Sequence, residues 1–174
     1  MAILENDKII LRAPEPEDLD ILFRWENDSE LWAYGTTLAP YSKFALRKYI
    51  SEAQNDIFQS RQLRLMIVLK ENEDAIGTID LYDFDPVNLR AGVGILLDSA
   101  YRGKGFGVQT LRLIQDYAFD FLHLKQLYAH VPQNNTSSMK LFTNCGYTKS
   151  GCLEQWLKCG NRFENVNVLQ LINS

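Results

Sequence analysis

The sequence predicts an α/β domain with a mixed, mostly antiparallel sheet that carries helices on both faces. Three features of the residue pattern lead to this prediction. Helical patterns come early, strand patterns with short connections follow, and the second half alternates strand and helix before a closing pair of strands. The chain of 174 residues has the length of one domain. Because no repeat or linker divides it, residues 1–174 are expected to fold together.

The first third of the chain reads as one strand and two helices. The stretch DKIILRAP is typical of a strand that ends at Pro14. PEPEDLDILFRWEND then begins a helix whose first turn is acidic, as the helix dipole favours. Ser42 is the expected N-cap of a second helix. The apolar positions of that helix recur at helical spacing and are Leu46, Ile50, Ala53 and Ile57.

The middle of the chain has the pattern of β-strands. LRLMIVLK and AIGTIDLYDF flank the turn-like ENED, and DPVN then leads into LRAGVGILLD. Strands that follow one another through short turns pair antiparallel. We therefore expect an antiparallel meander here.

The second half is expected to alternate helix and strand. A helix should follow AYRGKGFG, with one apolar face made of Gly107, Leu111, Ile114, Ala118 and Phe121. KQLYAHV reads as a strand, and NNTSSMKLFTNC as a short helix that Gly146 ends. The tail CLEQWLKCGNRFENVNVLQLI predicts two strands around a turn at residues 160–161.

The composition argues against several classes of function. The hydrophobic fraction of 46% and the charged fraction of 23% are those of an ordinary globular protein. A net charge of −4 argues against nucleic-acid binding, which needs a basic surface. No apolar run approaches the ~20 residues of a membrane span, and MAILENDKII lacks the pattern of an export signal. Cys145, Cys152 and Cys159 match no zinc spacing, so we expect reduced thiols, no metal and a cytoplasmic protein.

The stretch AYRGKGFGVQT contains the clearest indication of a ligand. Gly103, Gly105 and Gly107 remove side chains where the backbone turns, and Arg102 and Lys104 add positive charge. Successive N–H groups of such a loop, with the start of the following helix, can hold an anion such as phosphate. The same glycines would also suit a tight turn without a ligand. Their spacing fits neither the Walker loop nor the dinucleotide-binding fingerprint.

Two motifs in the right order resemble the GNAT superfamily of N-acetyltransferases. Residues 102–107 read R-x-x-G-x-G, the pattern that cradles the pyrophosphate of acetyl-CoA in that family. Residues 135–147 read N-x-x-S-x-x-L-F-x-x-x-G-Y, the second family motif. The opening segment and the closing hairpin resemble the RimJ/RimL-like branch and the spermidine N-acetyltransferases. The resemblance implies acetyl-CoA as cosubstrate, bound by Ile95, Leu96, Leu97, Arg102, Gly103, Lys104, Gly105, Phe106, Gly107, Asn135 and Ser138.

Acyl transfer from a thioester to an amine needs a polarised carbonyl and a group that takes the proton of the amine. The resemblance implies a bulge in the strand before the loop, where the N–H groups of Leu96 and Leu97 would face the acetyl oxygen. His130 is the candidate base, because an imidazole exchanges protons near neutral pH. One branch of the family has a glutamate at the matching place. An ordinary hydrogen-bonded histidine is the alternative, and His123 is expected to cap a helix end or face solvent.

The acid that would protonate the departing thiolate is where the sequence departs from the family. Many members carry a tyrosine at the position of Phe142, which has no proton to give. Water, Ser137, Ser138 or Cys145 are open alternatives, and the thiolate could also leave unassisted. Asn135 would bond the pantetheine arm by its place in the motif, and it would also suit a helix N-cap.

The acceptor pocket is expected to include Trp32, Tyr34, Tyr82 and Trp156, although aromatic residues at such spacings are often core. Spermidine acetyltransferases of this branch carry a glutamate pair in the segment that corresponds to YGTTLAPY, which has none here. Asp83 and Glu154 are the candidate substitutes. We therefore expect a protein N-terminal amine as acceptor, with spermidine or an aminoglycoside as the alternative. A catalytically silent acyl-CoA-binding module is an alternative of another class, and a homodimer is compatible with the sequence.

Overall fold

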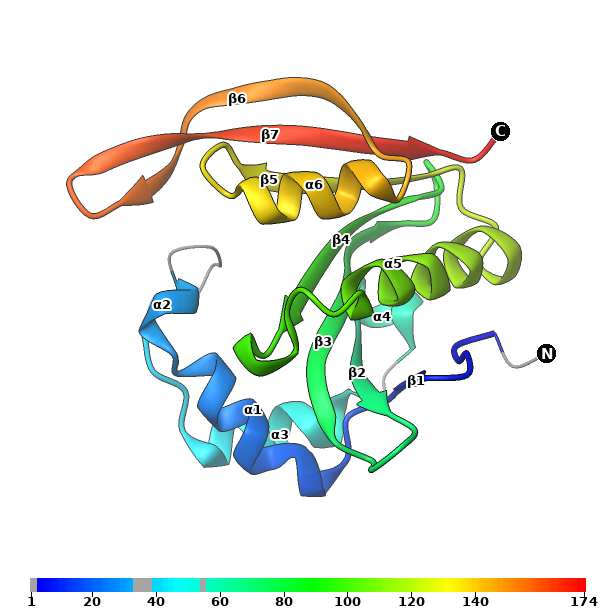
Figure 1. The fold of residues 1–174 in the computed structure, drawn as a ribbon, viewed down its shortest axis with the longest axis vertical. Coiled ribbons are helices and arrows are strands. Elements are labelled where there is room, and N and C mark those ends of the chain that lie inside the picture. Colours follow the sequence, from blue (N-terminus) through cyan, green and yellow to red (C-terminus); the bar gives the residue numbers. More distant parts are fainter. Residues whose placement is uncertain (1–2, 33–38, 54–55) are drawn as a thin grey trace.

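Figure 1 shows a computed structural model of the chain, which describes residues 3–32, 39–53 and 56–174. The strands of its central sheet lie in the order β1-β2-β3-β4-β5-β7-β6. Neighbouring strands are antiparallel except β4 and β5, which run parallel. The strands are β1 (Ile9–Arg12), β2 (Leu63–Leu69), β3 (Ala75–Asp85), β4 (Arg90–Leu97), β5 (Gln126–Pro132), β6 (Thr148–Cys159) and β7 (Arg162–Ile172).

The helices of the described residues are α1 (Leu19–Glu26), α2 (Ser29–Trp32), α3 (Lys43–Glu52), α4 (Ile57–Ser60), α5 (Phe106–Asp116) and α6 (Thr136–Asn144). The four predicted helices correspond to α1, α3, α5 and α6, and the structure adds two short helices, α2 and α4. Short 3-10 turns at Pro16–Asp18 and Ser99–Tyr101 precede α1 and the loop before α5, and a π-helical turn, Tyr117–Phe121, follows α5. The Ser42 hydroxyl accepts a hydrogen bond from the N–H of Ala45 at 3.0 Å, so it caps α3 as expected. Within the described ranges, no helix is long and apolar enough to cross a bilayer.

Each face of the sheet has its own apolar core, because the side chains of a strand alternate between the faces. Along β2, Leu65 and Ile67 belong to the core beneath α5 and α6, whereas Met66 and Val68 belong to the core beneath α1 and α3. Figure 1 shows these helix pairs on the two sides of the sheet. The predicted mixed, mostly antiparallel sheet with helices on both faces is confirmed.

Two apolar positions lie elsewhere than the sequence predicts. Ile57 does not extend the helix that begins after Ser42, because α3 ends at Glu52 and Ile57 begins the separate helix α4, which Asp56 caps. Phe121 is exposed and stacks on Tyr117, with the ring centroids 5.3 Å apart. The π-helical turn adds a residue to the helical repeat, and this rotates position 121 off the apolar face.

The two parallel strands pair over a short distance only. Residues 90–92 of β4 lie opposite residues 126–128 of β5, and no register continues beyond Gly92 and Tyr128. β4 runs on to Leu97 and β5 to Pro132. Figure 1 shows the two strands diverging from this junction. A gap between two strand edges therefore opens at the centre of the sheet.

Candidate active site

The glycine loop connects β4 to the start of α5 at the open end of this gap. Gly103 and Gly105 have φ values of +73° and +83°, a conformation that favours glycine, and a Cβ at either position would meet nothing within 4 Å. The loop from Arg102 to Gly105 is exposed. The Lys104 ammonium lies 5.4 Å from the centre of the Tyr101 ring. The loop is an open, positively charged surface.

The start of α5 directs free N–H groups into this loop. Gly105 is the N-cap residue, and no side chain accepts a hydrogen bond there. The first N–H that bonds back to the loop is that of Gln109, which donates to the Gly105 carbonyl at 3.3 Å. Among the described residues, no acceptor meets the N–H groups of residues 103–108. Unpaired amides at a helix N-terminus bind anions, so the ligand-binding interpretation of the loop fits better than the bare turn.

Gly107 has a different structural role from the other glycines of the loop. A Cβ there would lie 3.1 Å and 3.2 Å from the two methyl carbons of Leu141 and 3.4 Å from one methyl carbon of Leu97. Its lack of a side chain lets α5 pack closely against α6 and β4. The third glycine of the motif is therefore explained by packing, and the first two by the conformation of the loop.

The loop is also anchored to α1. Asp98, at the end of β4, accepts hydrogen bonds from the Trp25 indole at 3.0 Å and the Arg24 guanidinium at 2.6 Å. Its other carboxylate oxygen accepts from the Ala100 N–H at 3.1 Å. The Trp25 hydrogen bond is the largest reason that the pKa of Asp98 is lowered, with the Ala100 amide and Arg24 acting in the same direction. Trp25 is 5% exposed and belongs to the core beneath α1 and α3.

Alternate residues of β4 direct their backbone groups toward β5. The carbonyl of Leu89, just before β4, accepts hydrogen bonds from two N–H groups at the start of β5. The carbonyl of Leu97, at the far end of β4, accepts one from the Arg102 side chain at 2.9 Å. The odd-numbered residues between them point the same way, because successive residues of a strand alternate. Beyond the last paired residues, the N–H groups of Ile95 and Leu97 therefore face the gap.

β5 presents a matching edge. The N–H of Gln126 donates to the carbonyl of Leu89, just before β4, so the even-numbered residues of β5 point toward β4 and the odd-numbered ones toward β7. The N–H of His130 thus faces the gap beyond the last paired residues. Two open strand edges of this kind can bind an extended ligand that carries amide groups of its own. The pantetheine arm implied by the sequence motifs has this character.

The bulge expected in β4 is not found where the family resemblance placed it. Residues 92–97 pair with β3 in unbroken register, and the irregularity lies in β3 around Asp83, which has a φ of +47°. The N–H of Asp98 donates to the Ile76 carbonyl of β3, which shows that even-numbered residues of β4 face β3. Leu96 therefore directs its N–H at β3. Divergence of the strands, rather than a bulge, leaves Ile95 and Leu97 as the amides that can reach an acetyl oxygen.

The second motif forms α6 and its cap. The Asn135 side-chain oxygen accepts from the N–H of Ser138 at 3.1 Å, so the N-cap interpretation of Asn135 is confirmed. Phe142 is 3% exposed and packs edge-on against Tyr147, with the ring centroids 5.0 Å apart. The Cys145 thiol is buried and lies 4.0 Å from the Val108 carbonyl of α5. Burial raises the pKa of this thiol, and it faces the packing between helices.

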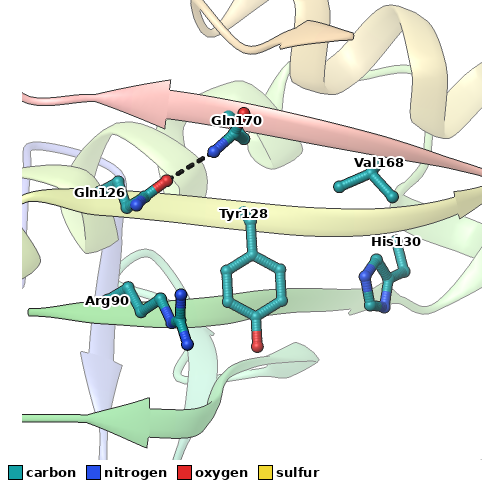
Figure 2. Close-up of a pocket in the computed structure, with 6 residues that line it drawn as sticks. All are labelled: Arg90, Gln126, Tyr128, His130, Val168 and Gln170. Atoms are coloured by element: carbon teal, nitrogen blue, oxygen red, sulfur yellow. Dashed lines mark hydrogen bonds between the residues drawn. The ribbon is translucent and has the colours of Figure 1, made fainter. Parts of the chain in front are cut away.

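The opposite face of the gap is covered by a row of aromatic rings. The Tyr82 and Tyr128 rings meet edge-on with their centroids 5.9 Å apart, and the His130 ring lies 5.5 Å from that of Tyr128. Their residues share one face, because Tyr82 pairs with Gly92 and Gly92 with Tyr128. Figure 2 shows Tyr128 and His130 side by side in a hollow of about 330 Å³. The hollow is lined by Arg90, Gln126, Tyr128, His130, Val168 and Gln170.

The carboxylates near this face differ in what neutralises them. Arg64 forms ion pairs with both Asp80 and Glu26 and ties β2, β3 and α1 together. Asp85 lies 3.3 Å from the Arg90 guanidinium. Asp83 is exposed and makes no ion pair with any described residue. Its charge helps to raise the pKa of Tyr128, after the larger effect of burial.

The remaining predicted pocket residues are not all brought together. Trp32 is half-buried at the end of α2, and its indole donates to the Glu26 carbonyl at 2.8 Å. Tyr34 lies outside the described residues. Trp156 is 62% exposed on the closing hairpin, where β6 shifts register against β7. His123 is exposed at a φ of +55° after the π-helical turn, so it faces solvent as expected.

Tyr128 is the site residue that sequence reasoning missed. It stands two positions before His130 on the same strand, and alternation places both side chains on one face. That spacing was the available signal. Among the described residues, no three histidine, cysteine, aspartate or glutamate side chains gather in a way that could hold a metal ion.

The diverging strands and the open loop amides are those expected of an acyltransferase that uses a coenzyme. Residues 8–148 match the family described as "Acetyltransferase (GNAT) domain". The chain belongs to this family. It is an N-acetyltransferase that uses acetyl-CoA, and the open amides of the loop and of β4 fit that coenzyme.

Similar proteins cover nearly the whole chain. An N-acetyltransferase of Bacillus licheniformis, p20, is 30% identical over 99% of this chain and 97% of its own. The spermidine N(1)-acetyltransferase of Vibrio cholerae is 25% identical over 97% of this chain and 95% of its own. A crystal structure of spermidine N-acetyltransferase from Vibrio cholerae, in complex with CoA and spermine, superposes with a TM-score of 0.85 at 24% identity, over 96% of each chain. These matches support the fold, and they do not place the chain in the RimJ/RimL-like branch, which stays a prediction.

Proposed function

We propose that this acetyltransferase transfers the acetyl group to a small, positively charged amine of the polyamine type, such as spermidine. The observation that carries this proposal is the aromatic row of Tyr82, Tyr128 and His130 on the acceptor side of the gap. The carboxylate of Asp83, which pairs with no cation of the described residues, lies close by. Aromatic faces and a free carboxylate both favour an ammonium group. Relatives named spermidine N(1)-acetyltransferase point to the same acceptor class.

This proposal departs from the acceptor that the sequence favoured, a protein N-terminus. That expectation rested on the lack of a glutamate pair in YGTTLAPY, of which residues 34–38 lie outside the described residues. Asp83 offers a carboxylate from another element, the irregular turn of β3. A longer polyamine could then place its reacting nitrogen at the gap and a second ammonium near Asp83.

In the proposed reaction, the chain's own groups act at three points. The amides of residues 103–108 hold the diphosphate. The N–H groups of Ile95 and Leu97 face the pantetheine arm and the acetyl oxygen, where hydrogen bonds strengthen as negative charge develops. His130, exposed in the hollow, takes the proton of the amine directly or through water.

The acceptor is tested by thiol release from acetyl-CoA with the full chain. The panel contains spermidine, a straight-chain diamine, a peptide that begins with alanine and an aminoglycoside. We expect kcat/KM for spermidine to exceed that for the peptide at least tenfold. Preference for the peptide would restore the N-terminal acceptor, and tight coenzyme binding without turnover on any amine would favour the silent binding module.

A pair of variants separates the two candidate carboxylates. Asp83→Asn should raise KM for spermidine about fivefold, which corresponds to one exposed ion pair of about 1 kcal/mol. Glu154→Gln removes an exposed carboxylate from β6, on the closing hairpin, and should leave KM unchanged. A raised KM in Glu154→Gln with an unchanged KM in Asp83→Asn would show that the second ammonium binds at the hairpin instead.

A further inference from the structure

We propose that Tyr82 is a catalytic residue whose hydroxyl gives the coenzyme sulfur its proton as the thioester breaks. This inference rests on the proposed function, in which His130 takes the proton of the amine. It supplies the acid that the sequence leaves open, because Phe142 has no proton and is buried in the core.

The position of the Tyr82 ring is fixed by a glycine. A Cβ at Gly92 would lie 2.3 Å, 2.4 Å and 2.8 Å from three carbons of this ring, so the ring lies flat on the backbone of β4. At Gly94 the nearest ring carbon is 3.8 Å away, an ordinary contact. The ring thus crosses β4 from β3 toward β5. No other residue type at position 92 would let it do so.

The Tyr82 hydroxyl is thereby carried to the junction where the strands part. Gly92 and Tyr128 are the last paired residues of β4 and β5. The backbone amide of His130 lies beside the phenol oxygen, where it partly offsets the rise of the tyrosine pKa. That amide faces the gap, as the alternation of β5 requires. The hydroxyl lies beside this amide at the junction of the two strands, where it can donate its own hydrogen into the gap.

The surroundings keep this hydroxyl protonated. Burial is the largest cause that raises the pKa of Tyr82, and the neighbouring Tyr128 is the second. The charges of Asp83 and Asp80 raise this pKa further, each by less than the His130 amide lowers it. Asp80 is held by Arg64, and Asp83 is the unpaired carboxylate. A phenol in this setting is a proton donor rather than a base at neutral pH.

The proton transfers of this step are completed by two side chains, Tyr82 and His130. The amine nitrogen forms a bond to the acetyl carbon, and the carbon–sulfur bond breaks. The sulfur leaves with the proton of Tyr82, while the surplus proton of the amine passes to the His130 imidazole. The phenolate then regains a proton from the imidazolium through water, so both residues return to their starting forms.

The test compares Tyr82→Phe with Tyr117→Phe in the full chain. Tyr82→Phe keeps the ring over Gly92 and removes only the hydroxyl. Tyr117 is a matched control, since its phenol is half-buried, its pKa is raised by burial and it lies on the far π-helical turn. We expect Tyr82→Phe to lower kcat at least 100-fold, with unchanged acetyl-CoA affinity and melting temperature, and Tyr117→Phe to match the wild type.

Two further readouts decide between a catalytic and a merely structural role. The solvent deuterium isotope effect on kcat should change in Tyr82→Phe, because the step that transfers this proton is altered. Hydrolysis of acetyl-CoA without any amine should fall in parallel, since water attack also needs a proton at sulfur. A kcat within threefold of the wild type, or a rise in amine KM alone, would overturn the inference.

The hydrolysis measurement also separates the two proposals. If spermidine is not an acceptor but hydrolysis still depends on Tyr82, the substrate proposal fails and the role of Tyr82 stands. If spermidine is acetylated equally well by Tyr82→Phe, the substrate proposal stands and the role of Tyr82 fails. A wild-type chain that releases no thiol with or without amine would overturn both.

Discussion

Gly105 ends the loop with a positive φ and open space where a side chain would be, directly beside the unpaired amides of α5. Gly160, in the turn of the closing hairpin, has a φ of +62° and equally open space. A side chain at either position costs about 1–2 kcal/mol of backbone strain. Only the one at Gly105 would also lie at the proposed diphosphate site.

Gly105→Glu and Gly160→Glu should therefore lose similar stability but differ in coenzyme binding. We expect the Kd for acetyl-CoA to rise at least tenfold in Gly105→Glu, because a carboxylate then repels the phosphates. Gly160→Glu should bind as the wild type does. Calorimetric titration gives both values, and equal affinities would show that the loop does not hold the diphosphate.

Single residues also mark what the sequence could and could not predict. The loop position of Gly105 could be predicted, because a glycine pattern before a helix is typical of a turn, with or without a bound anion. Tyr82 was predicted as an aromatic residue of the acceptor pocket, but not as a proton donor. Its place over the gap depends on the pairing of β3 with β4 and on Gly92. Contacts across strands are not encoded in local spacing, so its role could not be derived from the chain alone.

The loop is held as an element by its link to α1 through Asp98. Asp98 and Asp20 each lie 2.6 Å from a basic side chain, but the side chain of Asp98 is 16% exposed and that of Asp20 is 82% exposed. Asp98→Asn should lower the free energy of unfolding by about 1–2 kcal/mol at neutral pH, because a hydrogen-bonded charge is lost. Asp20→Asn should leave it unchanged, since exposed ion pairs contribute little.

The Asp98 effect has a defined pH dependence. The pKa of Asp98 in the folded chain is below its unfolded value of about 3.9, with the Trp25 hydrogen bond as the largest cause. Its contribution is therefore complete above that value and is lost as the pH falls through the folded pKa. Thermal melts of wild type and Asp98→Asn should differ at pH 7 and converge toward pH 3. A constant difference across this range would contradict the charged role of Asp98.

At the level of elements, most predicted boundaries came from signals next to the boundary itself. Ser42 begins α3 and Gly146 follows α6, as their capping preferences indicate. The helix predicted through Ile57 failed because helical spacing of apolar residues continued past the end of α3. The prediction that Phe121 lies on the apolar face was wrong because a π-helical turn changes the helical repeat, and no distinctive residue type marks such a turn.

For the molecule as a whole, the main feature is the divergence of β4 and β5, and it was not predictable from either strand. LRAGVGILLD and KQLYAHV give no sign that they pair over residues 90–92 and 126–128 only. The family resemblance suggested a bulge near Leu96 instead. The strand edges that the divergence exposes nevertheless have a fixed alternation, and this leads to a prediction about the liganded protein.

Saturating acetyl-CoA should slow hydrogen exchange in an alternating pattern along β4. The N–H groups of Ile95 and Leu97 face the gap, so a bound coenzyme should protect them, together with those of residues 103–108. Leu96 is already directed at β3 and should change little by local protection. Ligand at 100 times its Kd adds about 2.7 kcal/mol to global stability, so core amides that exchange only by complete unfolding will slow as well. Residue-resolved exchange by NMR distinguishes the two effects, because amides that open locally report the ligand and not the global shift. Protection of Leu96 with Ile95 and Leu97 left free would mean that the coenzyme lies elsewhere than between β4 and β5.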